Sequence, residues 1–363
     1  GAAGPPVEPC AAAVGRTRAG FFVVAPLVGR FGAAAVALPG GCEIGARPVD
    51  IYADGLRALG AVVDLRQGKL FAYTANGRGL VGGRFHLHFP SVGASKTLLM
   101  AAALAEGVTI LSNVAREPEV VDLAHFLVAS GAQIEGAGTS KLVVHGRKQL
   151  HGTEYTIIPD RIEAGTLMVA AAITRSCISL SPIIPHHLSS AIEKLSAAGC
   201  KIRQPSDGIL EVSAVHEAVG ELHGLYVKTS PFPGFPTDLQ PQFMSLLTTC
   251  NGMSTVEESI FERRMRHVEE LQKLGARIQL FGRTAVVMGN ERRGLSGTQV
   301  MATDLRSGAS LVLAGLAAEG ITEVASVGHV DRGYENLEGK LRDIGADITR
   351  VLDPVGNAAV RIV

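Results

Sequence analysis

Leu59-Gly60-Ala61-Val62-Val63 is the first of five copies of one phrase in this chain. Each copy ends a helical pattern, turns at a Gly-Ala or Gly-Cys pair and continues into a β-like run. The later copies turn at Gly131, Gly199, Gly275 and Gly345, so the phrase returns every 68 to 76 residues. This period is too long for ordinary solenoid repeats and suits a compact supersecondary unit. The sequence therefore predicts an array of similar units.

The second unit reveals the order of elements inside a repeat. The apolar and β-branched patterns predict strand, helix, strand, helix and hairpin, in that order, over 84–89, 92–106, 108–114, 119–130 and 133–145. Gly131 follows the second helical pattern, at the position where many helices end in a left-handed residue, most often glycine. The order is βαβαββ, and 154–214 and 298–363 are expected to repeat it.

Five markers are an awkward number for a symmetric protein, because six units in two sets of three would close two domains. We therefore expect a unit upstream of residue 1 to be absent. The expected domains are 1–157, which carries the Cys42 loop and lacks its first unit, and 158–363, which has three units.

Composition excludes several classes of function. The 363 residues are 47% hydrophobic, and Lys+Arg and Asp+Glu both number 34, so the net charge is zero. This balance excludes the broad basic field of a nucleic-acid-binding protein. No apolar run reaches the roughly 18 residues of a membrane span. Five scattered cysteines and isolated histidine pairs predict neither a zinc site nor a disulfide framework.

The densest group of functional residue types lies in Leu38-Pro39-Gly40-Gly41-Cys42-Glu43-Ile44-Gly45-Ala46-Arg47-Pro48-Val49-Asp50. Three glycines and a proline around Cys42 predict a loop. Arg47 would favour the thiolate of Cys42. A cysteine can serve as an acid in its thiol form and as a base or nucleophile in its thiolate form. Taken alone, the pattern is also compatible with an ordinary surface cysteine in a glycine-rich turn.

This loop resembles the active-site loop of the UDP-N-acetylglucosamine 1-carboxyvinyltransferase family of enolpyruvyl transferases. Further motifs resemble that family in the same order: Ser91-Val92-Gly93-Ala94, Ala115-Arg116-Glu117-Pro118-Glu119, Pro159-Asp160-Arg161-Ile162-Glu163-Ala164-Gly165-Thr166, Phe235-Pro236-Thr237-Asp238, Met301-Ala302-Thr303-Asp304-Leu305-Arg306 and Asp331-Arg332-Gly333-Tyr334-Glu335. The resemblance covers nearly the whole chain from about residue 15.

The resemblance implies both a fold and a reaction. The fold is α/β, with two domains that are each an inside-out α/β barrel of three βαβαββ units, as in EPSP synthase, and with the active site between them. About five of the six units would be present here. The reaction would transfer the enolpyruvyl group of phosphoenolpyruvate to the 3-hydroxyl of UDP-N-acetylglucosamine and release phosphate, without a metal or an organic cofactor.

Residue roles follow from the same resemblance. Cys42 matches the proton donor that is also the fosfomycin target, and Asp238 matches the carboxylate near the acceptor hydroxyl. Arg18, Arg47 and Arg332 match arginines around phosphoenolpyruvate, whose phosphate and carboxylate suit guanidinium groups. Arg306 is a fourth candidate. The expected nucleotide-sugar site comprises Arg47, Pro48, Val49, Asp50, Ile51, Phe89, Ser91, Val92 and Ile260.

Two departures from the family keep alternatives open. A Lys-Asn pair near the family's N-terminus has no counterpart, and Phe89 replaces a lysine that the family commonly has two residues before Ser91. One alternative is a catalytically impaired fragment or a nucleotide-sugar-binding pseudoenzyme. Another is 5-enolpyruvylshikimate-3-phosphate synthase, against which the Cys42 loop argues. A purely structural repeat protein would leave the motifs unexplained.

The resemblance also implies a setting. The partners would be the two small-molecule substrates, and the chain would be a monomer bound to neither nucleic acid nor membrane. The reaction opens peptidoglycan precursor synthesis and so serves cell-wall biogenesis, cell shape and cell division. It would take place in the bacterial cytoplasm, or in the plastid stroma of a photosynthetic eukaryote.

Overall fold

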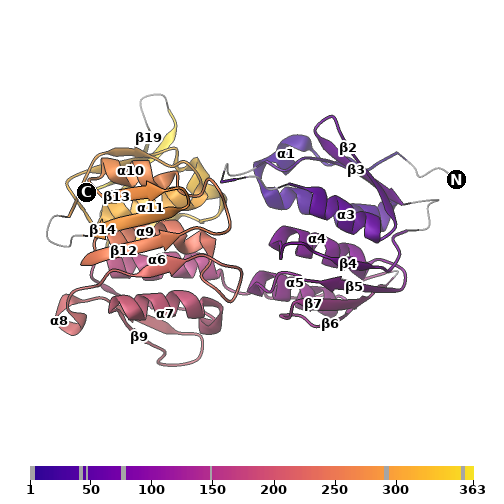
Figure 1. Cartoon of the computed structure of the whole chain (residues 1–363), viewed down its shortest axis with the longest axis horizontal. Helices are drawn as coiled ribbons and strands as arrows, with labels where there is room; N and C mark the ends of the chain where they lie inside the picture. The colour runs from indigo at the N-terminus through magenta and orange to yellow at the C-terminus, as the bar shows by residue number, and fades with distance from the viewer. Residues whose placement is uncertain are drawn as a thin grey trace. The chain divides into compact units, whose positions relative to one another are not determined.

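The computed structural model describes residues 5–40, 44–45, 48–74, 79–147, 149–289, 294–352 and 356–363. The chain forms two compact units, each with its own hydrophobic core (Figure 1). Unit 1 comprises Gly1–Gly41 and Arg47–Ile158, and unit 2 comprises Cys42–Ala46 and Pro159–Val363. None of the helices in the described part of the chain has the length and apolar character that a bilayer span requires.

Unit 1 contains two repeats. The first consists of α1 (Ala11–Arg16), η1 (Arg18–Val23), α2 (Val24–Phe31), β1 (Ala33–Ala37), α3 (Asp50–Ala58), β2 (Ala61–Arg66) and β3 (Lys69–Thr74). Its sheet has the order β1-β3-β2. Val7 pairs in parallel with Ala34 and so takes the place of the first strand.

The second repeat confirms the predicted βαβαββ order. It consists of β4 (Arg84–His86), α4 (Val92–Ala103), β5 (Val108–Ser112), α5 (Pro118–Ala129), β6 (Gln133–Glu135) and β7 (Lys141–His145). The sheet order is β4-β5-β7-β6, with β4 parallel to β5 and the other pairs antiparallel. Gly131 has a φ of +99°, which is the left-handed conformation expected after α5.

The third repeat corrects one expectation. It consists of α6 (Arg161–Ile173), β8 (Cys177–Leu180), η3 (Pro185–Leu188), α7 (Ser189–Ala198), β9 (Lys201–Arg203) and β10 (Leu210–Ser213), with the sheet order β8-β10-β9. The first strand expected near residue 154 does not form, because 151–160 is extended chain without ladder pairing where the chain passes from unit 1 to unit 2. Ile157 is 75% exposed there, as unpaired connecting chain would be.

The fourth and fifth repeats complete unit 2. The fourth consists of α8 (His216–Val219), β11 (Tyr226–Lys228), η4 (Thr237–Leu239), α9 (Gln240–Thr248), β12 (Gly252–Glu257), α10 (His267–Lys273), β13 (Arg277–Phe281) and β14 (Thr284–Gly289). The fifth consists of β15 (Leu295–Ser296), β16 (Gln299–Met301), α11 (Leu305–Leu316), β17 (Ala318–Glu319), β18 (Thr322–Ala325), η5 (Val327–Arg332), α12 (Leu337–Asp343), β19 (Ile348–Leu352) and β20 (Ala358–Ile362). Their main sheets have the equivalent orders β11-β12-β14-β13 and β16-β18-β20-β19.

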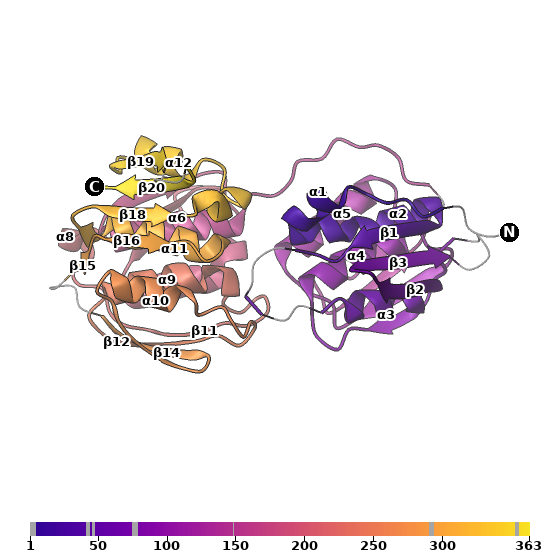
Figure 2. The same cartoon turned by 90° about the horizontal axis from the view of Figure 1, so that it is seen from above.

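In unit 2 the helices α6, α9 and α11 lie inside, one from each repeat, and the sheets face outward. Helices α6, α9 and α11 pack against one another, and all nine residues of α9 are buried. Figure 2 shows α9 and α11 between the sheet that contains β18 and the sheet that contains β12. Burial of apolar surface between these helices is the main source of stability for the unit. The three helices also begin close to one another, which brings their first turns together.

Glycines allow the last strand of two repeats to approach the end of the inner helix. A Cβ atom on Gly146, just after β7, would lie 1.6 Å from the carbonyl oxygen of Ala105 beyond α4. A Cβ atom on Gly289, at the end of β14, would lie 2.1 Å from the carbonyl oxygen of Cys250 beyond α9. Because the obstructing atoms belong to the backbone, no side-chain rotation can relieve the clash.

We expect Gly146→Ala and Gly289→Ala each to lower the free energy of unfolding by about 2 kcal/mol or more, because the backbone must shift. The control is Gly152→Ala, since its Cβ would meet nothing within 4 Å. That change should cost less than about 0.5 kcal/mol. Urea unfolding of the three variants compares their stabilities. Equal unfolding midpoints would disprove the explanation that the backbone approaches too closely for a Cβ atom.

Candidate active site

Three aspartates occupy equivalent positions at the starts of the three inner helices of unit 2. Asp160 caps α6, since its Oδ1 accepts hydrogen bonds from the N–H groups of Ile162 and Glu163, at 2.7 and 3.1 Å. Asp304 caps α11 in the same way. Asp238 lies in η4 before α9, where no side chain caps the helix. Its carboxylate is therefore available for another purpose.

The carboxylate of Asp238 forms ion pairs with two buried arginines. Arg264 Nη2 lies 2.7 Å from Oδ1, and Arg306 Nη2 lies 3.5 Å from Oδ2. The side chains of Arg264 and Arg306 are only 2% and 12% exposed, whereas that of Asp238 is 41% exposed. The positive charges thus lie beneath an accessible negative group, and two guanidinium groups face one carboxylate.

The arginines control the protonation of this carboxylate. The surrounding protein removes part of the water around the Asp238 carboxylate, and this desolvation alone would raise its pKa. The guanidinium groups of Arg306, Arg264 and Arg161 outweigh this desolvation and lower the pKa to about 2. Burial also acts to lower the pKa of Arg306, but the neighbouring Asp238 more than offsets it and the pKa is raised. Both groups are therefore charged at neutral pH, and the site retains positive charge that suits an anionic ligand.

A second carboxylate orders the backbone beside the site. Glu258 is 1% exposed. It accepts hydrogen bonds from the hydroxyl groups of Thr229 and Thr237 and from the N–H groups of Ile260 and Phe261, at 2.8 to 3.1 Å. This carboxylate therefore ties the end of β11, the residue before Asp238 and the segment after β12 into one rigid arrangement.

His267 holds the main chain of Arg264 through a hydrogen bond. Its ring is buried, and Nδ1 donates to the backbone oxygen of Arg264 at 3.1 Å. Burial lowers the pKa of His267 from 6.5 to about 4; the Arg264 guanidinium adds to the effect, and Asp304 opposes it. His267 is therefore neutral at physiological pH, so it adds no charge to the arginines around Asp238.

The other predicted residues of unit 2 are Arg332 and Ile260. Arg332 ends η5, is exposed and lies 3.3 Å from His329 Nδ1 through its Nη2. Two residues later, the ring of Tyr334 faces Arg306, whose Cζ is 5.2 Å from the ring centre. Ile260 is half-buried and is fixed through its N–H by Glu258.

Unit 1 places several of its predicted residues around the start of α4. Ser91 caps α4 by accepting from Ala94 N–H at 3.3 Å, so Val92 is the first helical residue. Phe89 precedes it and is 43% exposed. Tyr52 reaches this helix start because Gly93 has no side chain; a Cβ there would lie 2.1 Å from the Tyr52 hydroxyl.

The remaining residues of unit 1 lie on η1 and α3. Arg18 Cζ lies 6.0 Å from the centre of the Tyr52 ring. Val49 is the N-cap residue of α3, Asp50 is its first residue, and Ile51 is buried. Pro48 is exposed just before them. The structure thus gathers Arg18 and the start of α4 around Tyr52, and it presents 48–51 at the start of α3.

Cys42 and Arg47 lie outside the described residues. Between them, Ile44 and Gly45 are described and belong to unit 2. Ile44 is buried, and its carbonyl oxygen accepts from Arg263 N–H at 2.9 Å. No group of three potential metal-ligating side chains occurs within the described ranges.

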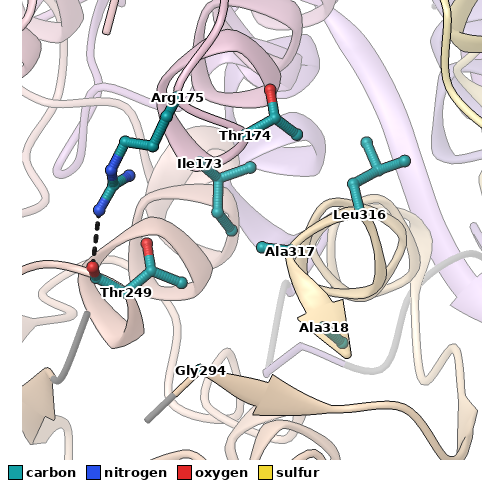
Figure 3. Close-up of a pocket in the computed structure, with 8 residues that line it drawn as sticks. All are labelled: Ile173, Thr174, Arg175, Thr249, Gly294, Leu316, Ala317 and Ala318. Atoms are coloured by element: carbon teal, nitrogen blue, oxygen red, sulfur yellow. Dashed lines mark hydrogen bonds between the residues drawn. The ribbon is translucent and has the colours of Figure 1, made fainter. Parts of the chain in front are cut away.

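A separate pocket lies at the opposite ends of the inner helices of unit 2. Figure 3 shows it between the last residues of α6, α9 and α11, with Arg175 donating to the carbonyl oxygen of Thr249 at 2.7 Å. The cavity holds about 310 Å³. Arg175 also donates to Ala172 O, so it joins the C-terminal ends of α6 and α9 rather than taking part in the Asp238 group.

Comparison with known proteins identifies the family. A family profile described as EPSP synthase (3-phosphoshikimate 1-carboxyvinyltransferase) matches residues 4–341. The chain belongs to the EPSP synthase family. Within it, the UDP-N-acetylglucosamine 1-carboxyvinyltransferase of Synechocystis sp. is 51% identical over 94% of this chain and 77% of its own length. The enzyme of the same name from Finegoldia magna is 48% identical over 93% and 78%.

Solved structures of this family confirm the predicted two-domain α/β fold. The enolpyruvyl transferase NikO from Streptomyces tendae superposes with a TM-score of 0.82 at 27% identity, over 94% of this chain and 79% of that one. EPSP synthase from Acinetobacter baumannii superposes with a TM-score of 0.68 at 18% identity, over 90% and 76%, which speaks for the fold alone.

Sequence reasoning missed Arg264, Glu258 and His267. Arg264 lies in Arg263-Arg264-Met265-Arg266, which reads as a solvated charged run because burial of one arginine among three leaves no periodic signal. Glu258 and His267 act through hydrogen bonds to backbone and neighbouring side chains, which a single sequence does not display. The repeats do contain a signal for the equivalent aspartates, since Thr237-Asp238-Leu239 and Thr303-Asp304-Leu305 have the same sequence.

The buried imidazole makes stability depend on pH. Because the pKa of His267 is lower in the folded protein than in the unfolded chain, the unfolded chain takes up the proton first on acidification. Between pH 6.5 and 4 this group should therefore reduce the free energy of unfolding by up to about 1.4 kcal/mol per pH unit. His267→Asn retains a donor for Arg264 O, cannot titrate, and should flatten this part of the stability curve. The exposed His125→Asn change should leave the curve unaltered, and equal slopes in the parent and His267→Asn would contradict the assignment.

Proposed function

We propose that this chain transfers the enolpyruvyl group of phosphoenolpyruvate to the 3-hydroxyl of UDP-N-acetylglucosamine and releases phosphate. The observation that carries the proposal is the accessible carboxylate of Asp238, which caps no helix and pairs with two buried arginines. The chain is also about half identical to a transferase of that name. A shikimate acceptor is less well supported, because the EPSP synthase compared is only 18% identical.

In this proposal the arginines bind the anionic donor. Arg306 lies beside Asp238, and Arg332 follows in the same repeat. We assign these two, with Arg18 and Arg47, to the phosphate and carboxylate groups of phosphoenolpyruvate. Guanidinium groups bind both groups through paired hydrogen bonds and stabilise the charge that develops on them.

Asp238 acts as the general base in the first step. It takes the proton of the sugar hydroxyl while the sugar oxygen bonds to C2 of phosphoenolpyruvate, and Cys42 delivers a proton to C3. The tetrahedral adduct then loses phosphate from C2, which leaves with the proton held by Asp238, and the Cys42 thiolate takes a proton back from C3. The C2–C3 double bond forms again, now as an enol ether. A carboxylate with a pKa of about 2 is a weak base. Binding of the phosphate dianion to the arginines would raise that pKa and prepare Asp238 to accept the proton.

The remaining predicted residues are assigned to the nucleotide sugar. Arg47, Pro48, Val49, Asp50 and Ile51 would contact it, and so would Phe89, Ser91, Val92 and Ile260. The N-terminus of α4 offers backbone N–H groups to the diphosphate beside the exposed Phe89. We propose that the chain acts as a monomer in the cytoplasm, or in the plastid stroma of a photosynthetic eukaryote, at the first committed step of peptidoglycan precursor synthesis.

The Asp238→Asn change should lower kcat for phosphate release by about 100-fold or more, because an amide cannot accept the hydroxyl proton. The measurement is phosphate release from phosphoenolpyruvate at saturating UDP-N-acetylglucosamine, with circular dichroism to verify folding. The exposed Asp207→Asn change is the matched control and should retain activity. Full activity of a folded Asp238→Asn protein would exclude the base role.

Cys42 is tested in the same assay. We expect Cys42→Ala to abolish phosphate release that depends on the sugar nucleotide, because alanine has no proton to give C3. The exposed Cys177→Ala change removes a thiol elsewhere and should have no effect. Fosfomycin should inactivate the parent and Cys177→Ala proteins alike; inactivation of the parent through any other cysteine would refute the assignment.

A further inference from the structure

Three buried polar side chains from the three repeats of unit 2 meet beneath Asp238. Thr166 comes from α6, Gln242 from α9, and Tyr334 follows η5. The Thr166 and Tyr334 hydroxyl oxygens are 2.8 Å apart, and Gln242 Nε2 lies 3.1 Å from each of them. None of the three side chains is more than 1% exposed.

The directions of these hydrogen bonds can be deduced. Thr166 donates its hydroxyl hydrogen to the carbonyl oxygen of Ile162 at 2.8 Å, so its oxygen is left to accept from Tyr334. The two N–H groups of Gln242 Nε2 are shared among three acceptors, which are the two hydroxyl oxygens and, at 2.9 Å, the carbonyl oxygen of Asp238. The Asp238 carbonyl oxygen can only accept a hydrogen bond, so the amide nitrogen of Gln242 must face it, which fixes the orientation of the Gln242 side chain.

This triad reaches both members of the ion pair in the site. Through Gln242 it holds the main chain of Asp238. Through the face of its ring, Tyr334 lies against Arg306, whose Cζ is 5.2 Å from the ring centre, an attractive arrangement of a cation and an aromatic ring. The Arg306–Asp238 pair is the longer of the two ion pairs, at 3.5 Å against 2.7 Å for Arg264.

We infer that Tyr334 is a positioning residue that holds Arg306 and Asp238 in register through Gln242 and Thr166. It does not touch the reacting atoms. It joins the two groups to the packed helices α6, α9 and α11, so that each group is placed by all three repeats. The kinetic consequence of this inference rests on the proposed function; its structural consequence does not.

The kinetic test is Tyr334→Phe, which keeps the ring beside Arg306 and removes the hydroxyl group that bonds to Thr166 and Gln242 and also interacts with the Arg306 guanidinium. We expect kcat for phosphate release to fall by about 10- to 100-fold, because small displacements of catalytic groups are costly. KM for UDP-N-acetylglucosamine should change by no more than about 3-fold, since the triad lies beneath the charged groups. Thr166→Val should reproduce the effect, and the double variant should add little to it.

The matched control is Ser245→Ala. Ser245 donates to the carbonyl oxygen of Ser310 at 2.8 Å, so this change also removes a buried hydrogen bond between α9 and α11, but away from the triad. It should lower the melting temperature about as much as Tyr334→Phe and leave kcat unchanged. A loss of kcat in Ser245→Ala equal to that in Tyr334→Phe would reduce Tyr334 to a purely structural role.

A crystal structure of Tyr334→Phe decides the inference independently of activity. We expect the Asp238 carboxylate and the Arg306 guanidinium to have separated beyond ion-pair distance. An unchanged pair would overturn the inference. If the parent protein releases no phosphate, the proposed function fails, and this structure still tests the positioning role.

Discussion

The carboxylate of Asp238 lies over two buried guanidinium groups, and much of unit 2 is arranged around that contact. Buried arginines are costly unless their charge is compensated, so the pairing requires Asp238 to stay at one place. Glu258 fixes the backbone on one side, His267 supports Arg264 from below without adding charge, and Gln242 holds the Asp238 main chain. The result is a rigid group in which the weakly basic carboxylate of Asp238 lies beside two guanidinium groups.

Repetition explains how such a site can arise. Each inner helix of unit 2 begins after an aspartate, and a capping aspartate stabilises a helix by about 1 kcal/mol. Asp160 and Asp304 retain that role. At the third position the 3-10 turn η4 precedes α9, and the carboxylate pairs with arginines instead. Unit 2 therefore contains three similar helix starts, of which two are capped by their aspartates and one has its aspartate paired with buried arginines.

The sequence predicted the repeat unit well because its signals are local. Helical spacing in α5, the β-branched run of β5 and the turn at Gly131 each depend on neighbouring residues only. The strand expected near residue 154 failed because an extended pattern forms a strand only when a partner is available for pairing. Asp238, Arg306 and Arg332 were predicted from motifs, whereas Arg264 and His267 were not, since burial and pairing depend on contacts between distant segments. The roles of all these residues stay predictions, and Cys42 and Arg47 in addition lie outside the described residues.

The most direct test of the central claim is a choice of acceptor. Phosphate release from phosphoenolpyruvate would be measured with this 363-residue chain, in the presence of UDP-N-acetylglucosamine, of shikimate 3-phosphate, or of neither. The account predicts release only with UDP-N-acetylglucosamine, in amounts equal to the sugar nucleotide consumed. Release with shikimate 3-phosphate instead, or binding of the sugar nucleotide by a folded chain that releases no phosphate, would contradict it.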